Sequence, residues 1–486
     1  MTLQYPTEPC REILVLGAGF SRALSAHMPL TDELGTLSVE RAGVASDARL
    51  PLGGFHDGNF ETWLSRMAED QPQLVPAQNR SNEALFLQIS AAIHQVLSER
   101  EFTVLSDDAP EWLYVLLSLI HLRQATVITF NYDTLLECGV WNHHLYDFEM
   151  NQRVLGDDVI NDVPPRPFGY ARLNGSVTET FRLLKLHGAL NWYWSTGDVT
   201  GATLNRWTFP GTFGLPIPYD EAARRRQLPG REPFVVPPTA TKSAYYANPI
   251  TRELWRQAAE ALTAAERVSL VGYSLPPADI MFSGMFSDAI RNRDVAIEIV
   301  NPDPHPLQER IEMLGGSKDH ISSISGEDCV AAFVGDYRDR TSREFVCCLR
   351  DTAKDDPFLD VPLVLSWGNP AHADPAASAV SDLRVSTDGR ELELVAESNP
   401  PIGGAMAARF DKDGSPQTDP VLVTLRSLTE NFGSAERINS LTADGTRVAI
   451  VGAWQAGNNV GYSNRWQVLV PSGRPRGWAT QLPTQD

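Results

Sequence analysis

Short apolar runs alternate along the chain with stretches that have helical spacing. The runs lie at residues 13–16, 127–130, 183–186, 268–271 and 297–300. Between them, apolar residues recur three and four positions apart, as in Phe60, Trp63, Leu64 and Met67, which is the spacing of one helix face. Buried strands that alternate with helices predict a mostly parallel sheet covered on both faces.

The same pattern divides the chain. A helical insertion is predicted at about 31–125, and residues 189–233 read as loop-rich, with tryptophans that we interpret as core and loop anchors. After about residue 340, short alternating runs are separated by Asp-Gly turns at 388, 413 and 444, which is typical of hairpins. We therefore predict an α/β fold, in which a Rossmann-like parallel sheet with a helical insertion (1–345) is followed by a small all-β domain (360–486).

Each apolar run ends in polar residues or glycine. The endings are Gly17-Ala18-Gly19-Phe20-Ser21, Asn131-Tyr132-Asp133, His187-Gly188, Gly272-Tyr273-Ser274 and Asn301-Pro302-Asp303. In an open parallel sheet the carboxyl ends of the strands share one edge, and ligands bind there where the strand order reverses. Five such endings predict a site for a large polar ligand at that edge.

The endings have structural as well as functional explanations. The glycines of the first ending permit a tight turn and close approach to a phosphate, although Arg22 replaces the third glycine of the pattern G-x-G-x-x-G. Asn131 and Asp133 can bind ribose hydroxyls or a water, or can cap the following helix. His187 precedes a glycine and is expected to open onto a cleft as a general base, the alternative being a structural histidine.

Composition narrows the classes of partner. The chain has 41 Lys and Arg against 61 Asp and Glu, a net charge of −20, so we expect no general nucleic-acid or anionic-membrane surface. We find no signal peptide and no run near the roughly 18 apolar residues of a membrane helix. The five cysteines include no C-x-x-C pair, so we expect no bound metal and a reduced, cytoplasmic protein.

The collected motifs resemble those of the sirtuin family. "GAGFS", "TFNYD", "KLHG", "VGYSL" and "IVNPDP" follow the family's order and spacing over about residues 11–305. The likeness extends to the sirtuin-like domains of bacterial antiphage defence proteins, which similarly combine "GAGFS" and "MPLTDEL" with "NFE", "FNYD", "LHG" and "GYSLPPAD".

The resemblance implies a role for each ending. The pyrophosphate of NAD and its adjacent ribose would be held by Gly17, Ala18, Gly19, Phe20 and Ser21. The nicotinamide ribose would be held by Asn131 and Asp133, with His187 as the catalytic histidine. The adenosine side would be lined by Gly272, Tyr273, Ser274 and Asn301.

Two departures from the family concern its peptide-binding part. Sirtuin deacylases carry a zinc ribbon of two C-x-x-C pairs, which this chain lacks, and residues 28–32 replace their Gly-Ile-Pro-Asp-Phe-Arg loop. The implied function is an NAD+ hydrolase (NAD glycohydrolase) that releases nicotinamide and ADP-ribose, with Asn131 and His187 as catalytic residues. An NAD-dependent protein deacylase and a non-catalytic sensor of NAD or ADP-ribose are the alternatives.

An ungated enzyme of this kind would deplete the NAD of its own cell. We therefore expect a gate, used in antiphage defence by NAD depletion, and the β domain at 360–486 is our candidate for a sensing or assembly module. We also expect a homo-oligomer, joined by a partner protein or activator that acts through this domain.

Overall fold

The computed structural model describes residues 11–143, 146–147, 152–160, 180–207, 210–218, 220–240, 242–337 and 340, together with the backbone of seven strands between 365 and 466. Within the described part, no helix combines the length and apolar character needed to cross a membrane.

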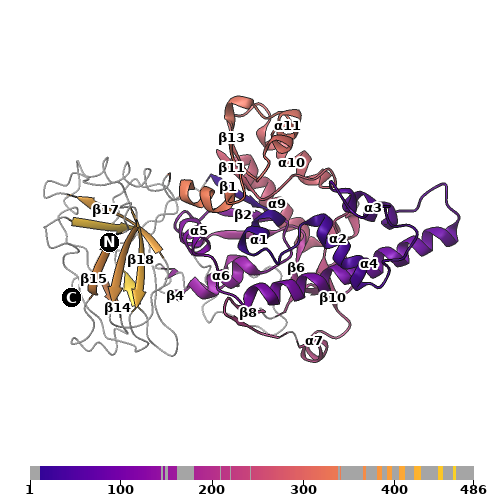
Figure 1. Cartoon of the computed structure of the whole chain (residues 1–486), viewed down its shortest axis with the longest axis horizontal. Helices are drawn as coiled ribbons and strands as arrows, with labels where there is room; N and C mark the ends of the chain where they lie inside the picture. The colour runs from indigo at the N-terminus through magenta and orange to yellow at the C-terminus, as the bar shows by residue number, and fades with distance from the viewer. Residues whose placement is uncertain are drawn as a thin grey trace.

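Six parallel strands form the central sheet (Figure 1). In chain order they are β1 (Glu12–Leu16), β2 (Thr126–Thr129), β5 (Arg182–Lys185), β11 (Arg267–Val271), β12 (Ala296–Val300) and β13 (Ile321–Ile324). Across the sheet the order is β5-β2-β1-β11-β12-β13, and every neighbouring pair is parallel. Numbered along the chain, this is the 3-2-1-4-5-6 order of the Rossmann fold, so the predicted fold class is confirmed.

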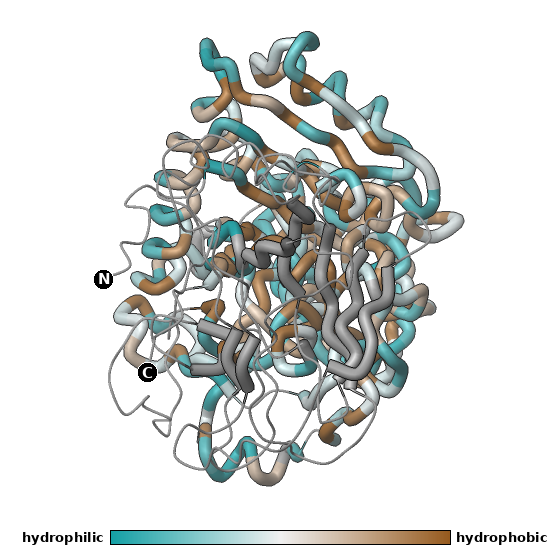
Figure 2. The backbone as a smooth tube through the Cα atoms, turned by 90° about the vertical axis from the view of Figure 1, so that its left-hand side faces the viewer, coloured by the Kyte–Doolittle hydropathy of each residue, from teal (hydrophilic) through white to brown (hydrophobic). Residues whose placement is uncertain are grey.

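The strands are apolar because both faces of the sheet are buried. In β1, Leu14 and Leu16 belong to one core, whereas Ile13 and Val15 belong to the other. Apolar residues recur along the described strands and helices, with polar residues between them (Figure 2). The period-two alternation of side chains along each strand thus separates two helical layers.

The first layer contains the predicted helical insertion, and the second contains three later helices. The first consists of α1 (Ala18–Leu24), α2 (Thr31–Arg41), α3 (Asn59–Ala68), α4 (Pro76–Leu105), α5 (Glu111–Leu122) and α6 (Leu135–His143). The second consists of α9 (Pro249–Ala264), α10 (Ile280–Ile290) and α11 (His305–Met313). Helix α9 begins sharply because Asn248 accepts a hydrogen bond from the Ile250 amide (3.0 Å) and Pro249 follows it, a strong N-terminal signal.

A strand lies where the sequence predicted loops. β6 (Gly188–Trp194) is buried along its whole length and pairs antiparallel with β7 (Asn205–Arg206) and β10 (Glu232–Val235). Trp192 and Trp194 pack in the second core, so their interpretation as anchors is confirmed. The loop prediction was wrong because the glycines and prolines of residues 189–233 indicated turns. The seven residues of β6 nevertheless suit a buried strand.

The remaining elements between β3 and α8 are short. They are β3 (Tyr146–Asp147), β4 (Gln152–Arg153), a 3₁₀ turn at Asp158–Ile160, β8 (Gly211–Thr212), β9 (Leu215–Pro216), α7 (Glu221–Gln227) and α8 (Ser243–Tyr246). A further 3₁₀ turn at Lys318–His320 precedes β13.

Beyond residue 360 the described elements are all strands, as predicted. They are β14 (Leu365–Trp367), β15 (Val380–Val385), β16 (Glu391–Ala396), β17 (Gly404–Phe410), β18 (Val421–Ser427), β19 (Arg447–Val451) and β20 (Asn464–Trp466). The sheet β15-β16-β18-β17-β19 contains one parallel pair, β16 with β18, so it is not a plain series of hairpins. The predicted boundary at 345–360 lies outside the described residues.

Candidate functional site

The first ending packs against the fourth at the point where the strand order reverses. The amide of Gly17 donates to the carbonyl of Val271 (3.1 Å), and that of Gly19 donates to the carbonyl of Gly272 (2.8 Å). A Cβ on Gly17 would lie 2.6 Å from the Gly272 oxygen, and one on Gly19 would lie 2.8 Å from the Gly272 Cα. Close packing of two strand ends therefore requires both glycines, before any ligand is considered.

This contact changes the interpretation of the glycine turn. The sequence assigned the amides of Gly17 and Gly19 to a phosphate, but both already have partners within the protein. Ala18 and Gly19 are half-exposed, whereas Gly17 is buried. A pyrophosphate at this turn would therefore meet residues 18–19 at the surface.

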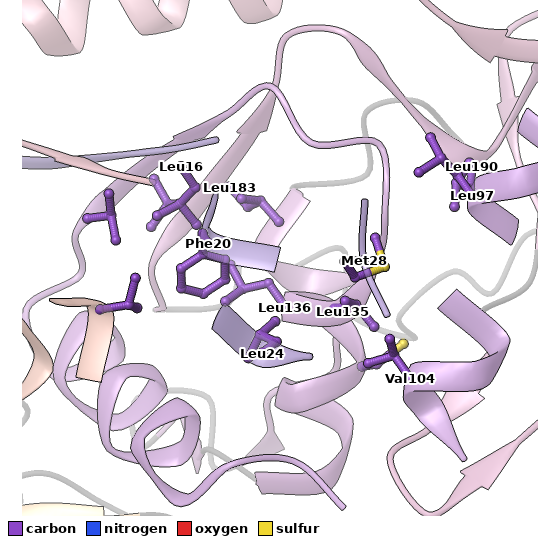
Figure 3. Close-up of a cluster of buried hydrophobic side chains, with 14 of the residues drawn as sticks. Leu16, Phe20, Leu24, Met28, Leu97, Val104, Leu135, Leu136, Leu183 and Leu190 are labelled. Carbon is purple, nitrogen blue, oxygen red and sulfur yellow. The ribbon is translucent and has the colours of Figure 1, made fainter. Parts of the chain in front are cut away.

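Phe20 fixes the glycine turn to the first core. Its side chain is 2% exposed and points into the first core beside Leu16, Leu136 and Leu183 (Figure 3). Its ring also meets the edge of Trp112 at a centroid distance of 5.7 Å. The residue holds α1 on the sheet, which places Ser21 beside the second ending.

Asn131, Ser21 and Asp133 form one hydrogen-bonded group. The Asn131 Nδ2 donates to the Gly17 carbonyl (2.8 Å) and to the Ser21 Oγ (2.9 Å), and that hydroxyl donates to the Asp133 Oδ2 (2.7 Å). Both amide hydrogens of Asn131 are therefore used, which leaves its Oδ1 to accept a bond from a ligand. Asp133 is 8% exposed and supports Ser21 from within.

A buried ionic group lies beneath these residues. The Lys185 Nζ donates to the Asp133 carbonyl (2.6 Å) and lies 3.0 Å from the Glu137 Oε1, with both of these side chains 1% exposed. Burial raises the pKa of Glu137, and Lys185 opposes that shift. These two residues and Asn131 line a small pocket beside the glycine turn. The second ending is therefore supported by a buried ion pair.

Glu101 connects the helical insertion to the same ending. This α4 side chain is 3% exposed, and its Oε1 accepts bonds from the Thr134 amide (2.5 Å) and hydroxyl (3.0 Å). Burial raises its pKa to about 8, so the carboxyl is mostly protonated at neutral pH. No local sequence pattern signals this contact, because it joins residues 33 positions apart.

We expect Glu101→Gln to be tolerated at pH 7, because the amide keeps the acceptor oxygen and the wild-type side chain is neutral there. Glu101→Ala should lower the free energy of unfolding by about 1–3 kcal/mol, since it leaves the Thr134 amide unsatisfied. Folding raises the pKa of Glu101 to about 8. Its contribution to the free energy of unfolding is therefore fully present below the unfolded-state pKa and is lost as the pH rises to 8. Urea unfolding between pH 5 and 9 tests this, and an equal decline in the Gln variant would contradict it.

His187 lies at the end of β5, next to the end of β2. Its side chain is 4% exposed, although the sequence predicted a ring open to a cleft. The ring meets Phe130 edge-on at 4.8 Å and Tyr132 in parallel at 6.5 Å. These aromatic neighbours bury the ring, which corrects our expectation that it stands at the sheet's edge outside the core.

Two residues that sequence analysis did not assign to the site contact this histidine. The Lys242 Nζ lies 3.3 Å from the His187 Nε2, and the Asp279 Oδ1 lies 3.7 Å from it. Lys242 forms a short ion pair with Asp279, whose Oδ2 accepts a bond from the Tyr273 hydroxyl (2.8 Å). Burial and then Lys242 lower the pKa of His187 to about 3, against the influence of Asp279. The imidazole is therefore neutral.

Glu61 approaches this cluster from the helical insertion. It lies on α3, whose first amides are held by Asp32: the Gly58 amide at 2.8 Å and the Phe60 amide at 3.2 Å. Burial and the charge of Asp279 raise the pKa of Glu61 to about 7, against Lys242. A second carboxyl thus acts on the ion pair beside His187.

Of the residues predicted for the adenosine side, Tyr273 belongs to this group through its bond to Asp279. Tyr273 is 4% exposed and stacks on Phe130 at 4.6 Å, whereas Ser274 is exposed. Asn301 ends β12, and its Oδ1 accepts a bond from the Asp303 amide (3.1 Å), which is the turn that a structural explanation predicted. The adenosine-side assignments of these residues stay predictions.

The described residues offer no group of three or more His, Cys, Asp or Glu arranged to hold a metal ion. Cys138 and Cys329 are buried and free, while the other three cysteines lie outside the described residues.

No protein-family model and no curated protein matches the chain. Among solved structures, it is similar to a Sir2 homologue in complex with NAD, with 15% identity, a TM-score of 0.33, and coverage of 68% of this chain and 90% of that one. It is similar to a Sir2 homologue mutant in complex with ADP-ribose (14% identity, TM-score 0.31, 67% and 90%). A third match is a structure on the mechanism and regulation of Sir2 enzymes (12%, 0.30, 69% and 95%).

Proposed function

We propose that the chain is an NAD+ hydrolase, which uses water to release nicotinamide and ADP-ribose. The observation that carries the proposal is the placement of Asn131 and a neutral His187 on the ends of neighbouring parallel strands, beside the reversal of strand order. Ligands of open α/β sheets bind at that point. An amide acceptor and an unprotonated imidazole are the groups that a hydrolytic step needs there.

The proposed reaction breaks the bond between the nicotinamide nitrogen and C1′ of the ribose. The bonding electrons leave with nicotinamide, a water oxygen bonds to C1′, and the proton of that water passes to a base. The Oδ1 of Asn131 would position the water or a ribose hydroxyl, because both hydrogens of its Nδ2 are bonded within the protein. His187 would accept the proton, since burial and Lys242 keep its imidazole uncharged.

The rest of NAD would extend across the reversal point. We assign the pyrophosphate and adjacent ribose to residues 17–21, of which Ala18 and Gly19 reach the surface. We assign the adenosine side to Gly272, Tyr273, Ser274 and Asn301. We assign the nicotinamide ribose to Asn131 and Asp133, and Asp133 also fixes the Ser21 hydroxyl that donates to it.

We infer a gate and a defence role from the sequence resemblance and from the cost of uncontrolled NAD loss. The all-β strands between 365 and 466 are the proposed sensing or assembly module, acting in a homo-oligomer or through a partner protein. The net charge of −20 argues against general nucleic-acid binding as the alternative role.

The test is to incubate the full chain with NAD in H₂¹⁸O and to follow nicotinamide and ADP-ribose by chromatography and mass spectrometry. We expect equal amounts of both products, with one ¹⁸O in each ADP-ribose. A parallel reaction contains an acyl-lysine peptide. Product that appears only with the peptide and carries the acyl group would identify a deacylase. NAD that binds and stays intact would identify a sensor.

A further inference from the structure

The lysine beside His187 belongs to none of the strand endings that the sequence assigned to the site, yet it is among the most buried cations described. Lys242 is 5% exposed and stands just before α8 (Ser243–Tyr246), 55 positions after the histidine. A buried ammonium is costly unless it is paired and hydrogen-bonded. Asp279 provides that partner, and Tyr273 holds the other oxygen of the same carboxylate.

The distances decide which ring nitrogen carries the proton. At 3.3 Å, the Lys242 Nζ is within hydrogen-bond reach of the His187 Nε2, whereas the Asp279 Oδ1 at 3.7 Å is not. An ammonium group only donates, so the Nε2 must accept. The imidazole proton therefore lies on Nδ1.

We propose that Lys242, held by Asp279, is a positioning residue for His187, which keeps the imidazole uncharged with its proton on Nδ1. The catalytic consequence of this inference rests on the proposed function. In that reaction His187 would act as a base whose Nε2 is unprotonated. The contact of Lys242 with Asp279 is much shorter than its contact with His187. A ribose hydroxyl or water can therefore replace Lys242 at the Nε2 while the ion pair stays intact.

The other groups around His187 leave Lys242 as the controlling charge. Tyr132 and Tyr273 face the cluster from the ends of β2 and β11, and burial raises their pKa values well above 10, so both are neutral. Glu61 of α3 acts on Asp279 and Lys242. Asp279 alone would raise the pKa of His187, and the nearer Lys242 outweighs it.

The primary test is nitrogen NMR of the full chain labelled with ¹⁵N-histidine, with His187→Gln to assign the signal. In the wild type we expect the Nδ1–H tautomer and no titration of His187 above pH 5. In Lys242→Met the unopposed Asp279 should raise the pKa of His187 by about 1–3 units. Lys242→Arg keeps the charge and should retain the low pKa. The exposed Lys318→Met, which loses only a surface pair with Glu312, is the control and should change nothing.

Lys242→Met leaves the buried carboxylate of Asp279 without its partner, which disfavours folding. A second variant therefore tests the inference without that buried charge. Lys242→Met/Asp279→Asn removes both charges, and it should also raise the pKa of His187, by less than the single change. The inference is overturned by an Nε2–H tautomer in the wild type, or by an unchanged pKa of His187 in both variants.

Enzyme kinetics provide a separate readout. If NAD is cleaved as proposed, the acid limb of kcat/KM should move to higher pH in Lys242→Met and should stay in place in Lys242→Arg. If the wild type does not cleave NAD, the proposed function fails while the NMR titration still decides the state of His187. The two failures are therefore distinguishable.

Discussion

Replacing His187 with alanine is expected to slow nicotinamide release about 10²- to 10⁴-fold, the usual loss when a general base is removed. The variant should still bind NAD, because the glycine turn is held by its own contacts with Val271 and Gly272. The Lys242–Asp279 pair also survives, since its short contact does not involve the imidazole. The measurement is nicotinamide release beside NAD affinity from calorimetry, under conditions where the wild type is active.

The control separates loss of a base from loss of a buried ring. His94 is 8% exposed, and its Nε2 lies 3.0 Å from the Leu190 carbonyl. His94→Ala should lower thermal stability and leave the rate per folded molecule near that of the wild type. Assays of both variants are made below their unfolding midpoints, because His187 packs on Phe130. NAD cleavage at the wild-type rate by His187→Ala would rule out the proposed mechanism.

The sheet and the placement of the site followed from local patterns. Five of the six strands overlap an apolar run with a polar or glycine ending, and parallel strands bring such endings to one edge. The sequence predicted that Asn131 and His187 share this edge, and the structure shows that they follow neighbouring strands. It missed β13, whose pattern of exposed serines in "ISSI" lacks an apolar run, and β6, which glycine- and proline-rich neighbours obscured.

The second group of site residues was beyond local reasoning. Lys242 lies outside any helix or strand and Asp279 lies just before α10, so neither position belongs to a strand ending. Their contact joins positions 37 residues apart, and both meet a histidine from a third segment. Glu61 reaches the same cluster from the helical insertion. The charges that act on His187 arise only when the separate segments of Lys242 and Asp279 pack against it.

The burial of His187 also could not be predicted from its neighbours in the sequence. A histidine before a glycine, at the end of a strand, was expected to face open space. Gly188 instead has φ +80°, and a Cβ there would lie 2.1 Å from the Phe234 carbonyl oxygen. That turn leads directly into β6, which closes over the region. The glycine therefore serves a chain reversal and a close strand contact, and the neighbouring ring is covered as a result.

Gly272→Ala is expected to lower the free energy of unfolding by about 2–5 kcal/mol and to abolish most NAD binding. Gly272 has φ +60°, and its Cβ would lie 2.2 Å from the Phe20 nitrogen and 2.4 Å from the Gly19 carbonyl carbon. The left-handed conformation costs about 1–2 kcal/mol for a residue with a Cβ, and overpacking adds about 1–3 kcal/mol. The contacted atoms are backbone, so relief requires the glycine turn to move, which would displace the proposed pyrophosphate site. Urea unfolding and calorimetry with NAD measure the two effects.

Substitutions at two other glycines distinguish backbone strain from steric contact of the added Cβ. Gly230 has φ +67° and no atom within 4 Å of its Cβ position, so Gly230→Ala should cost only the conformational part, about 1–2 kcal/mol. Gly284 lies exposed in α10 with equally open space, so Gly284→Ala should stabilise the helix by about 0.5–1 kcal/mol. NAD affinity should be unchanged in both. If Gly272→Ala costs no more stability than Gly230→Ala and still binds NAD, the close packing of the first and fourth strand ends does not support the site. The larger loss at Gly272 is expected because only there do strain and contact act on the same turn.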